Sequence, residues 1–127
     1  MSESSRCVLL VEDEALVAMV AVDALNELGF EVIEAASATV ALQLAETNKD
    51  KIGVALVDLG LPDLPGEELV GELRSLYPGL PIIVASGKGP GAIDEKLQSL
   101  HDIVILPKPY NFDDLQSVVE RVVGLPG

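Results

Sequence analysis

Five side chains that could carry chemistry follow short apolar runs in the sequence. Glu12 and Asp13 come after the first run, Asp58 after the third, Ser86 after the fourth and Lys108 after the fifth. Carboxylates are ligands for Mg²⁺, Mn²⁺ and Ca²⁺, and one or two of them with waters and a phosphate suit Mg²⁺ best. A hydroxyl and a lysine beside such a metal could bind a phosphoryl group and offset its charge.

Asp58 is the acid with the clearest structural context. The four apolar residues 54–57 precede it and are typical of a buried strand, while two prolines and two glycines within residues 58–66 predict a loop. A buried charge is costly, but the carboxyl end of a strand is where open α/β sheets bind ligands. The alternative for a single acid is an ordinary cap for the next helix. Asp63 is a further candidate ligand, although a turn residue between two prolines is the simpler interpretation.

Composition limits the class of protein. The 127 residues are 49% hydrophobic, with no Trp and 3% aromatic residues, so the core must be aliphatic, as in parallel strands covered on both faces. The net charge of −13 argues against binding nucleic acid. The single Cys7 excludes an internal disulfide and is expected to pack in the first strand. Without a signal-peptide pattern or an apolar run of roughly 20 residues, we expect a cytoplasmic protein that neither enters nor binds a membrane.

Apolar runs alternate with segments of helical periodicity along the whole chain. Gly29 and Ser37 are suited to end and begin helices, and Val17, Val20, Ala21, Ala24, Leu25 and Leu28 form the apolar stripe of the first helix. The predicted strands are 7–11, 30–35, 52–57, 82–85 and 103–106. The predicted helices are 15–28, 38–47, 67–76, 92–100 and a last one that begins after Asn111 or Asp113 and runs to residue 123.

This alternation predicts an α/β fold, a flavodoxin-like (βα)5 doubly wound parallel sheet. The expected strand order is 2-1-3-4-5, whose switch point lies between the first and third strands. Glu12, Asp13 and Asp58 should therefore converge there, where they would repel one another unless a positive charge sits among them.

With these residues in this order, the sequence resembles the receiver domains of response regulators in bacterial two-component signalling. The resemblance spans about residues 7–123, within a single domain of residues 1–127. It rests on Glu12-Asp13, on Asp58 with Leu-Gly-Leu-Pro-Asp-Leu-Pro-Gly behind it, on Ser86, and on Lys108-Pro109-Tyr110. Residues 84–89 are also partly similar to a receiver subgroup with a Phe-Ala-Thr-Gly-type segment, although Val replaces Phe and Ser replaces Thr.

The resemblance implies that Asp58 is the phosphoacceptor. Its carboxylate would take a phosphoryl group from a sensor histidine kinase or a phosphotransfer protein and thereby switch protein–protein interactions. Asp13, Asp58 and the backbone carbonyl of Gly60 would bind Mg²⁺ (or Mn²⁺), and Glu12 would hold the metal through water. The domain would not be an enzyme acting on a separate substrate, but would assist its own phosphorylation and dephosphorylation.

The resemblance also assigns Ser86 and Lys108 to the phosphoryl oxygens and implies a cis peptide bond before Pro109. One departure from the family is Ile105, which stands three residues before the lysine, where receivers usually carry a switch Tyr or Phe. We expect Tyr110 to contribute packing and not to replace that switch.

The same residues are compatible in part with three other functions. A degenerate receiver that binds partners without phosphorylation is favoured by Ile105 but opposed by the acids, Ser86 and Lys108. A flavodoxin would need a phosphate-binding loop where residues 12–14 are all acidic, and an Asp-nucleophile phosphohydrolase would need an acid where Gly60 stands.

The family's usual partner surface comprises the fourth helix, the fifth strand and the fifth helix, so self-association through it is expected. The chain ends shortly after the last predicted helix. It is therefore either a free-standing receiver or part of a longer regulator, and the closeness of Met1 to the first strand favours a receiver at a natural N-terminus.

Overall fold

The computed structural model describes residues 7–48, 50–87 and 103–123. The elements are β1 (Cys7–Val11), α1 (Ala15–Glu27), β2 (Glu31–Ala35), α2 (Ala38–Thr47), β3 (Ile52–Asp58), α3 (Gly66–Leu76), β4 (Ile82–Ser86), β5 (Ile103–Pro107) and α5 (Phe112–Val123). From β1 to β4 strands and helices alternate as the sequence predicts, and β5 is followed by a last helix. The predicted helix 92–100 lies outside the described residues, and with it part of the surface expected to mediate self-association.

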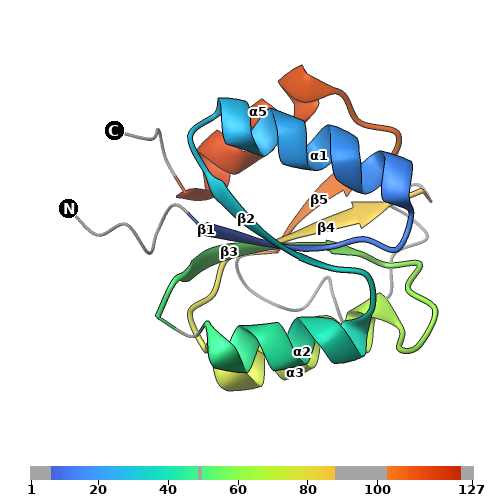
Figure 1. The fold of residues 1–127 in the computed structure, drawn as a ribbon, viewed down its shortest axis with the longest axis vertical. Coiled ribbons are helices and arrows are strands. Elements are labelled where there is room, and N and C mark those ends of the chain that lie inside the picture. The colour runs from blue at the N-terminus through green and yellow to red at the C-terminus, as the bar shows by residue number, and fades with distance from the viewer. Residues whose placement is uncertain (1–6, 49, 88–102, 124–127) are drawn as a thin grey trace.

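All five strands form one parallel sheet in the order β2-β1-β3-β4-β5, which confirms the predicted topology. In Figure 1 the sheet is seen nearly edge-on, with α1 and α5 on one face and α2 and α3 on the other. The carboxyl ends of β1 and β3 are neighbours, because Val11 pairs with Val57. The loops that follow these two strands therefore begin side by side.

Burial of both sheet faces follows from the apolar runs. Successive side chains of a strand point to opposite faces, so Leu9 enters the core under α2 and α3 while Leu10 enters the core under α1 and α5. Cys7 is also buried, as expected of a small apolar residue. β2 lies at the sheet edge, where Glu31 and Glu34 are exposed.

Local capping chemistry sets the helix ends. Gly29 has a φ of 94°, which favours glycine after α1, and the Ser37 hydroxyl accepts a hydrogen bond of 3.2 Å from the Val40 amide at the start of α2. Of the two caps predicted for α5, Asn111 performs the role: its Oδ1 accepts a hydrogen bond from the Asp114 amide at 2.8 Å.

The predicted apolar stripe of α1 was wrong at Val20, which is 53% exposed, whereas Ala18 is buried. Consecutive residues lie about 100° apart around a helix, so Val20 falls outside the face that is centred on Ala21 and packs on the sheet. None of the helices in the described residues is long and apolar enough to cross a membrane.

Candidate functional site

Asp58 is the last residue of β3 and lies at the carboxyl edge of the sheet. It is only 6% exposed, because it directly follows the four buried apolar residues 54–57 of the same strand. The next residue, Leu59, donates its backbone N–H to the Ala85 carbonyl at 3.1 Å, so the main chain is held against β4 past the end of the strand. The phosphoacceptor candidate is therefore fixed by the sheet itself.

Glu12 and Asp13 follow β1 on the adjacent strand. The Glu12 amide donates to the Ala35 carbonyl at 3.0 Å, which continues the pairing with β2 beyond the strand, and the Glu12 side chain accepts a bond of 3.1 Å from the Glu14 amide. Glu12 is buried and Asp13 is exposed. One acid thus lies under the loop and the other at its surface.

Glu12, Asp13 and Asp58 come together as the switch point predicts, with one carboxylate oxygen from each within 4.8 Å of the others. Hard oxygen donors at this density suit a divalent cation, and two of the three acids are buried, where their mutual repulsion is weakly screened. The donor set therefore fits a metal of the Mg²⁺ type.

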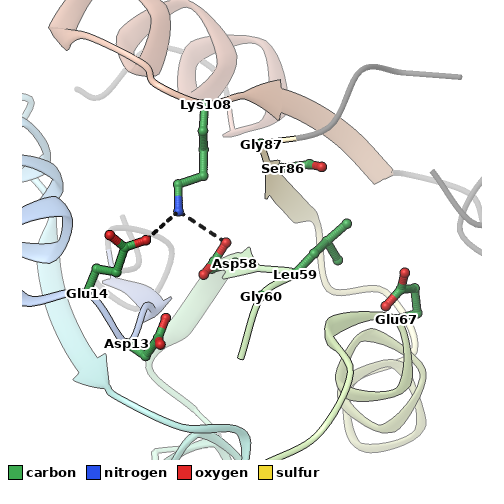
Figure 2. A pocket seen from close by; sticks show the side chains of 9 residues that line it. All are labelled: Asp13, Glu14, Asp58, Leu59, Gly60, Glu67, Ser86, Gly87 and Lys108. Atoms are coloured by element: carbon green, nitrogen blue, oxygen red, sulfur yellow. Dashed lines mark hydrogen bonds and ion pairs between the residues drawn. The ribbon is translucent and has the colours of Figure 1, made fainter. Parts of the chain in front are cut away.

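Lys108 brings a positive charge to the same place from the end of β5. Its Nζ lies 3.3 Å from Glu12 Oε1, 3.3 Å from Asp58 Oδ1 and 3.6 Å from Glu14 Oε1. Figure 2 shows the lysine descending between Glu14 and Asp58. Its backbone is anchored as well, since the Lys108 amide donates to the Ser86 carbonyl at 2.8 Å.

Burial and charge act in opposite directions on these groups. Burial raises the pKa of Glu12, opposed by its hydrogen bond from the Glu14 amide and by the charge of Lys108. Burial alone would lower the pKa of Lys108, but the nearby Asp58 and Glu12 charges outweigh it and the pKa rises. The lysine therefore stays protonated and holds two buried acids that would otherwise repel each other.

An open pocket of about 630 Å³ lies over Asp58, large enough for a phosphoryl group with its surrounding ligands. Asp13, Gly60, Ser86 and Lys108 contribute to its lining (Figure 2). A Cβ at Gly60 would lie 3.6 Å from Asp58 Oδ2, an ordinary contact, so glycine leaves this side of the carboxylate open. Five of the residues predicted for the site therefore line one pocket, and Glu12 is joined to it through Lys108: the five are Asp13, Asp58, Gly60, Ser86 and Lys108.

The chain departs from the usual receiver pattern within β5, at Ile105, and agrees with it directly after β5, at Pro109 and Tyr110. The peptide bond between Lys108 and Pro109 is cis, the isomer that the resemblance implies. Ile105 packs with the core under α2 and α3, whereas Tyr110 packs with the core under α1 and α5. Burial raises the pKa of Tyr110 to about 12, with the charge of Glu12 adding to it. Tyr110 and Ile105 thus occupy opposite faces of the sheet.

Sequence reasoning missed Glu14 and Glu67, which also line the pocket. The run of three acids at residues 12–14 was a signal for Glu14, because a lysine drawn to two of them would also meet the third. Glu67 lies in the first turn of α3, where an acid is already explained by the positive end of the helix dipole, so the sequence held no separate signal for it. Asp63 is neither a ligand of the cluster nor a simple turn residue, since its carboxylate binds the start of α2.

A doubly wound sheet with three converging carboxylates and a lysine at its switch point defines a phosphoryl-binding domain of the receiver class. The model of the response regulator receiver domain family matches residues 8–120, so the chain belongs to that family, which serves two-component signalling.

Known relatives agree with this assignment. The chain is 34% identical over 119 residues to the sensor kinase CckA of Brucella abortus, covering 94% of this chain and 13% of the kinase. It is 30% identical to the transcriptional regulatory protein PdtaR of Mycobacterium tuberculosis, covering 94% of this chain and 57% of the regulator. The chain thus spans only part of the relatives that it matches.

Solved structures support the same fold. The chemotaxis response regulator CheY4 of Vibrio cholerae superposes with a TM-score of 0.81 at 27% identity, covering 91% of this chain and 97% of that one. The receiver domain of the hybrid histidine kinase CckA gives a TM-score of 0.79 at 30% identity, covering 92% of this chain and 98% of that one.

Proposed function

We propose that this receiver domain is a phosphoacceptor whose reactive group is the Asp58 carboxylate. The observation that carries the proposal is the position of Asp58 at the switch point of the sheet. Its carboxylate lies beside those of Glu12 and Asp13 and 3.3 Å from the Lys108 ammonium, and it lines an open pocket. Such an arrangement can receive a phosphoryl group because a cation and a metal-type ligand set would share its charge.

The reaction is a phosphoryl transfer from a phosphohistidine of a sensor kinase or phosphotransfer protein. An Asp58 oxygen forms a bond to phosphorus while the bond from phosphorus to the imidazole nitrogen breaks, and the electron pair of that bond stays on the histidine. The product is an acyl phosphate on Asp58. Its later hydrolysis returns the carboxylate and inorganic phosphate, so the domain assists its own phosphorylation and dephosphorylation and acts on no other substrate.

The surrounding residues divide the remaining work. Asp13, Asp58 and the Gly60 carbonyl would hold Mg²⁺, with Glu12 behind them, and the bound metal would neutralise phosphoryl charge. Lys108 supplies a second positive charge, and the Ser86 hydroxyl would donate to a phosphoryl oxygen. The protein contributes position and electrostatics and little covalent chemistry.

The proposed setting is the cytoplasm, where residues 1–127 act as one receiver domain that changes its protein partners on phosphorylation. A second candidate is a degenerate receiver that binds partners without phosphorylation. Ile105 favours it, because the residue at the usual aromatic switch position is aliphatic and packs into the core under α2 and α3.

Intact mass measured after incubation with Mg²⁺ and acetyl phosphate separates the two. We expect one phosphoryl adduct on the wild type and on Asp23→Asn, which replaces an exposed acid of α1. Asp58→Asn should form none, and EDTA should prevent the adduct on the wild type. A wild type that acquires no adduct from acetyl phosphate or from a phosphorylated kinase would establish the degenerate receiver.

A further inference from the structure

Asp63 makes a long-range contact that neither the phosphoacceptor chemistry nor a turn explains. Its carboxylate accepts three hydrogen bonds from the first turn of α2: from the Ala38 amide at 2.9 Å, from the Thr39 amide at 2.9 Å and from the Thr39 hydroxyl at 2.7 Å. These bonds hold the pKa of Asp63 at about 2, with the Thr39 hydroxyl as the largest cause. An exposed residue of the β3–α3 connection is thereby tied to a helix 25 positions away in the chain.

The β3–α3 connection is restrained at both its base and its tip. At the base, the Gly66 amide approaches the Leu59 carbonyl at 3.4 Å, and a Cβ on Gly66 would lie 2.6 Å from the Leu59 Cα, so the two ends are in close contact. At the tip, Asp63 is bound to α2. Gly60, whose carbonyl is a proposed metal ligand, lies between these two points.

The start of α2 also leads to the other half of the acidic cluster. Ala35, three residues before Ala38, accepts the backbone hydrogen bond of Glu12 at 3.0 Å. Residues 35–39, from the end of β2 to the first turn of α2, therefore bond to both loops that carry the acids: to Glu12 through Ala35, and to the loop that follows Asp58 through Asp63.

Asp63 is not needed merely to begin α2. Ser37 already caps the helix by accepting from the Val40 amide, the third free donor of the first turn. Asp63 takes the first two donors, at Ala38 and Thr39, from a distant part of the chain. A local cap and a long-range carboxylate thus share one helix end, and only the carboxylate reaches the phosphoacceptor loop.

We infer that Asp63 is a positioning residue for the metal site: by joining the β3–α3 loop to the start of α2, it sets the place of the Gly60 carbonyl relative to Glu12 and Asp13. This inference rests on the proposed function, since it needs a divalent cation at the acidic cluster. It adds a residue that touches neither the metal nor the phosphoryl group and still controls metal affinity.

Calorimetric titration with Mg²⁺ tests the inference through four variants. Asp63→Ala removes all three contacts and should raise the Mg²⁺ Kd about tenfold, in the range found when groups supporting metal ligands are lost. Asp63→Asn keeps an oxygen for the Ala38 amide and should give an intermediate Kd. Thr39→Val removes only the hydroxyl contact, and Ser37→Ala removes only the local cap. Both should stay near the wild-type value.

Phosphorylation by acetyl phosphate at increasing Mg²⁺ gives a second readout. For Asp63→Ala, the Mg²⁺ concentration at half-maximal rate should rise with the Kd, while the rate at saturating Mg²⁺ should match the wild type. Equal Mg²⁺ affinity of Asp63→Ala and wild type would overturn the inference, as would an equal loss in Ser37→Ala, which would reduce Asp63 to a helix cap. A wild type that binds no Mg²⁺ would overturn the metal site itself and the inference with it.

Discussion

Two acids near the site show how surroundings decide the behaviour of a carboxylate. Burial raises the pKa of Glu12, whereas hydrogen bonds from Thr39 and Ala38 lower the pKa of Asp63 to about 2. Asp63 is exposed, and exposure by itself leaves the pKa of a carboxyl group near its ordinary value. The hydrogen bonds are therefore what lowers the pKa of Asp63. The three donors to Asp63 favour its charged form.

This difference predicts a pH dependence for Asp63→Asn. Because the pKa of Asp63 is lower in the folded than in the unfolded protein, its contribution to stability is present above the unfolded value near 4 and is lost as pH falls toward 2. Urea unfolding at pH 6, 4 and 3 should give a larger free energy of unfolding for the wild type than for Asp63→Asn. The difference between the two proteins should decrease as the pH is lowered. The contribution of Glu12 is common to both proteins and cancels. A margin that stays constant or grows would contradict the assigned contacts.

At the scale of the helices and strands, the sequence carried most of the information. Short apolar runs and glycine and proline breaks located every described element within one or two residues, because the three central strands β1, β3 and β4 are buried on both faces. The convergence of Glu12, Asp13 and Asp58 also followed, since parallel strands end at one edge. The bond from Asp63 to α2 could not be predicted, because it depends on how a loop folds back over a helix 25 positions away.

The exposed apolar face of α1 is another feature that the hydrophobic periodicity of the sequence did not predict. Leu16, Met19 and Val20 are 77%, 61% and 53% exposed, and a second pocket of about 520 Å³ lies between the start of α1 and the segment after β5. This pocket shares Glu14, Gly87 and Lys108 with the pocket over Asp58. A protein that seats an apolar helix on α1 would therefore place its own side chains beside Asp58.

Because the two pockets share these residues, we expect the phosphodonor protein to bind to the exposed face of α1. Leu16→Asp should lower kcat/KM for transfer from a phosphohistidine partner about tenfold, as loss of an apolar anchor does at protein interfaces. The rate with acetyl phosphate, which needs no docking, should be unchanged. The control is Val40→Asp, which places the same charge at an exposed valine of α2 on the other face of the sheet. Equal losses in both variants, or a loss with acetyl phosphate, would exclude α1 as the docking helix.

For the molecule as a whole, the dominant quantity is its net charge of −13. The site concentrates this imbalance, because Glu12, Glu14 and Asp58 lie within 4 Å of the Lys108 ammonium and Asp13 lies beside Glu12 and Asp58. Repulsion among these acids weakens the folded state, and any cation held there would relieve it. Metal binding should therefore be visible in global stability as well as in phosphorylation.

Thermal unfolding with and without Mg²⁺ measures this coupling. At a concentration 100 times its Kd, a ligand of the folded state adds about 2.7 kcal/mol, which for a domain of this size raises the unfolding midpoint by about 10 °C. NaCl at matched ionic strength screens the overall charge without filling the site and should raise the midpoint much less. EDTA should reverse the effect of Mg²⁺.

Asp13→Asn separates binding at the site from a general salt effect. Asp13 is exposed and lies close to Glu12 and Asp58, so its neutralisation costs little packing and removes repulsion; the metal-free variant should unfold at or above the wild-type temperature. The increase in unfolding temperature that Mg²⁺ causes should be less than half as large for Asp13→Asn as for the wild type, because one of the proposed direct ligands is missing. Asp23→Asn, which neutralises an exposed acid on α1, should keep the full rise. Equal rises in all three proteins would show that Mg²⁺ acts on the overall charge and not at the acidic cluster.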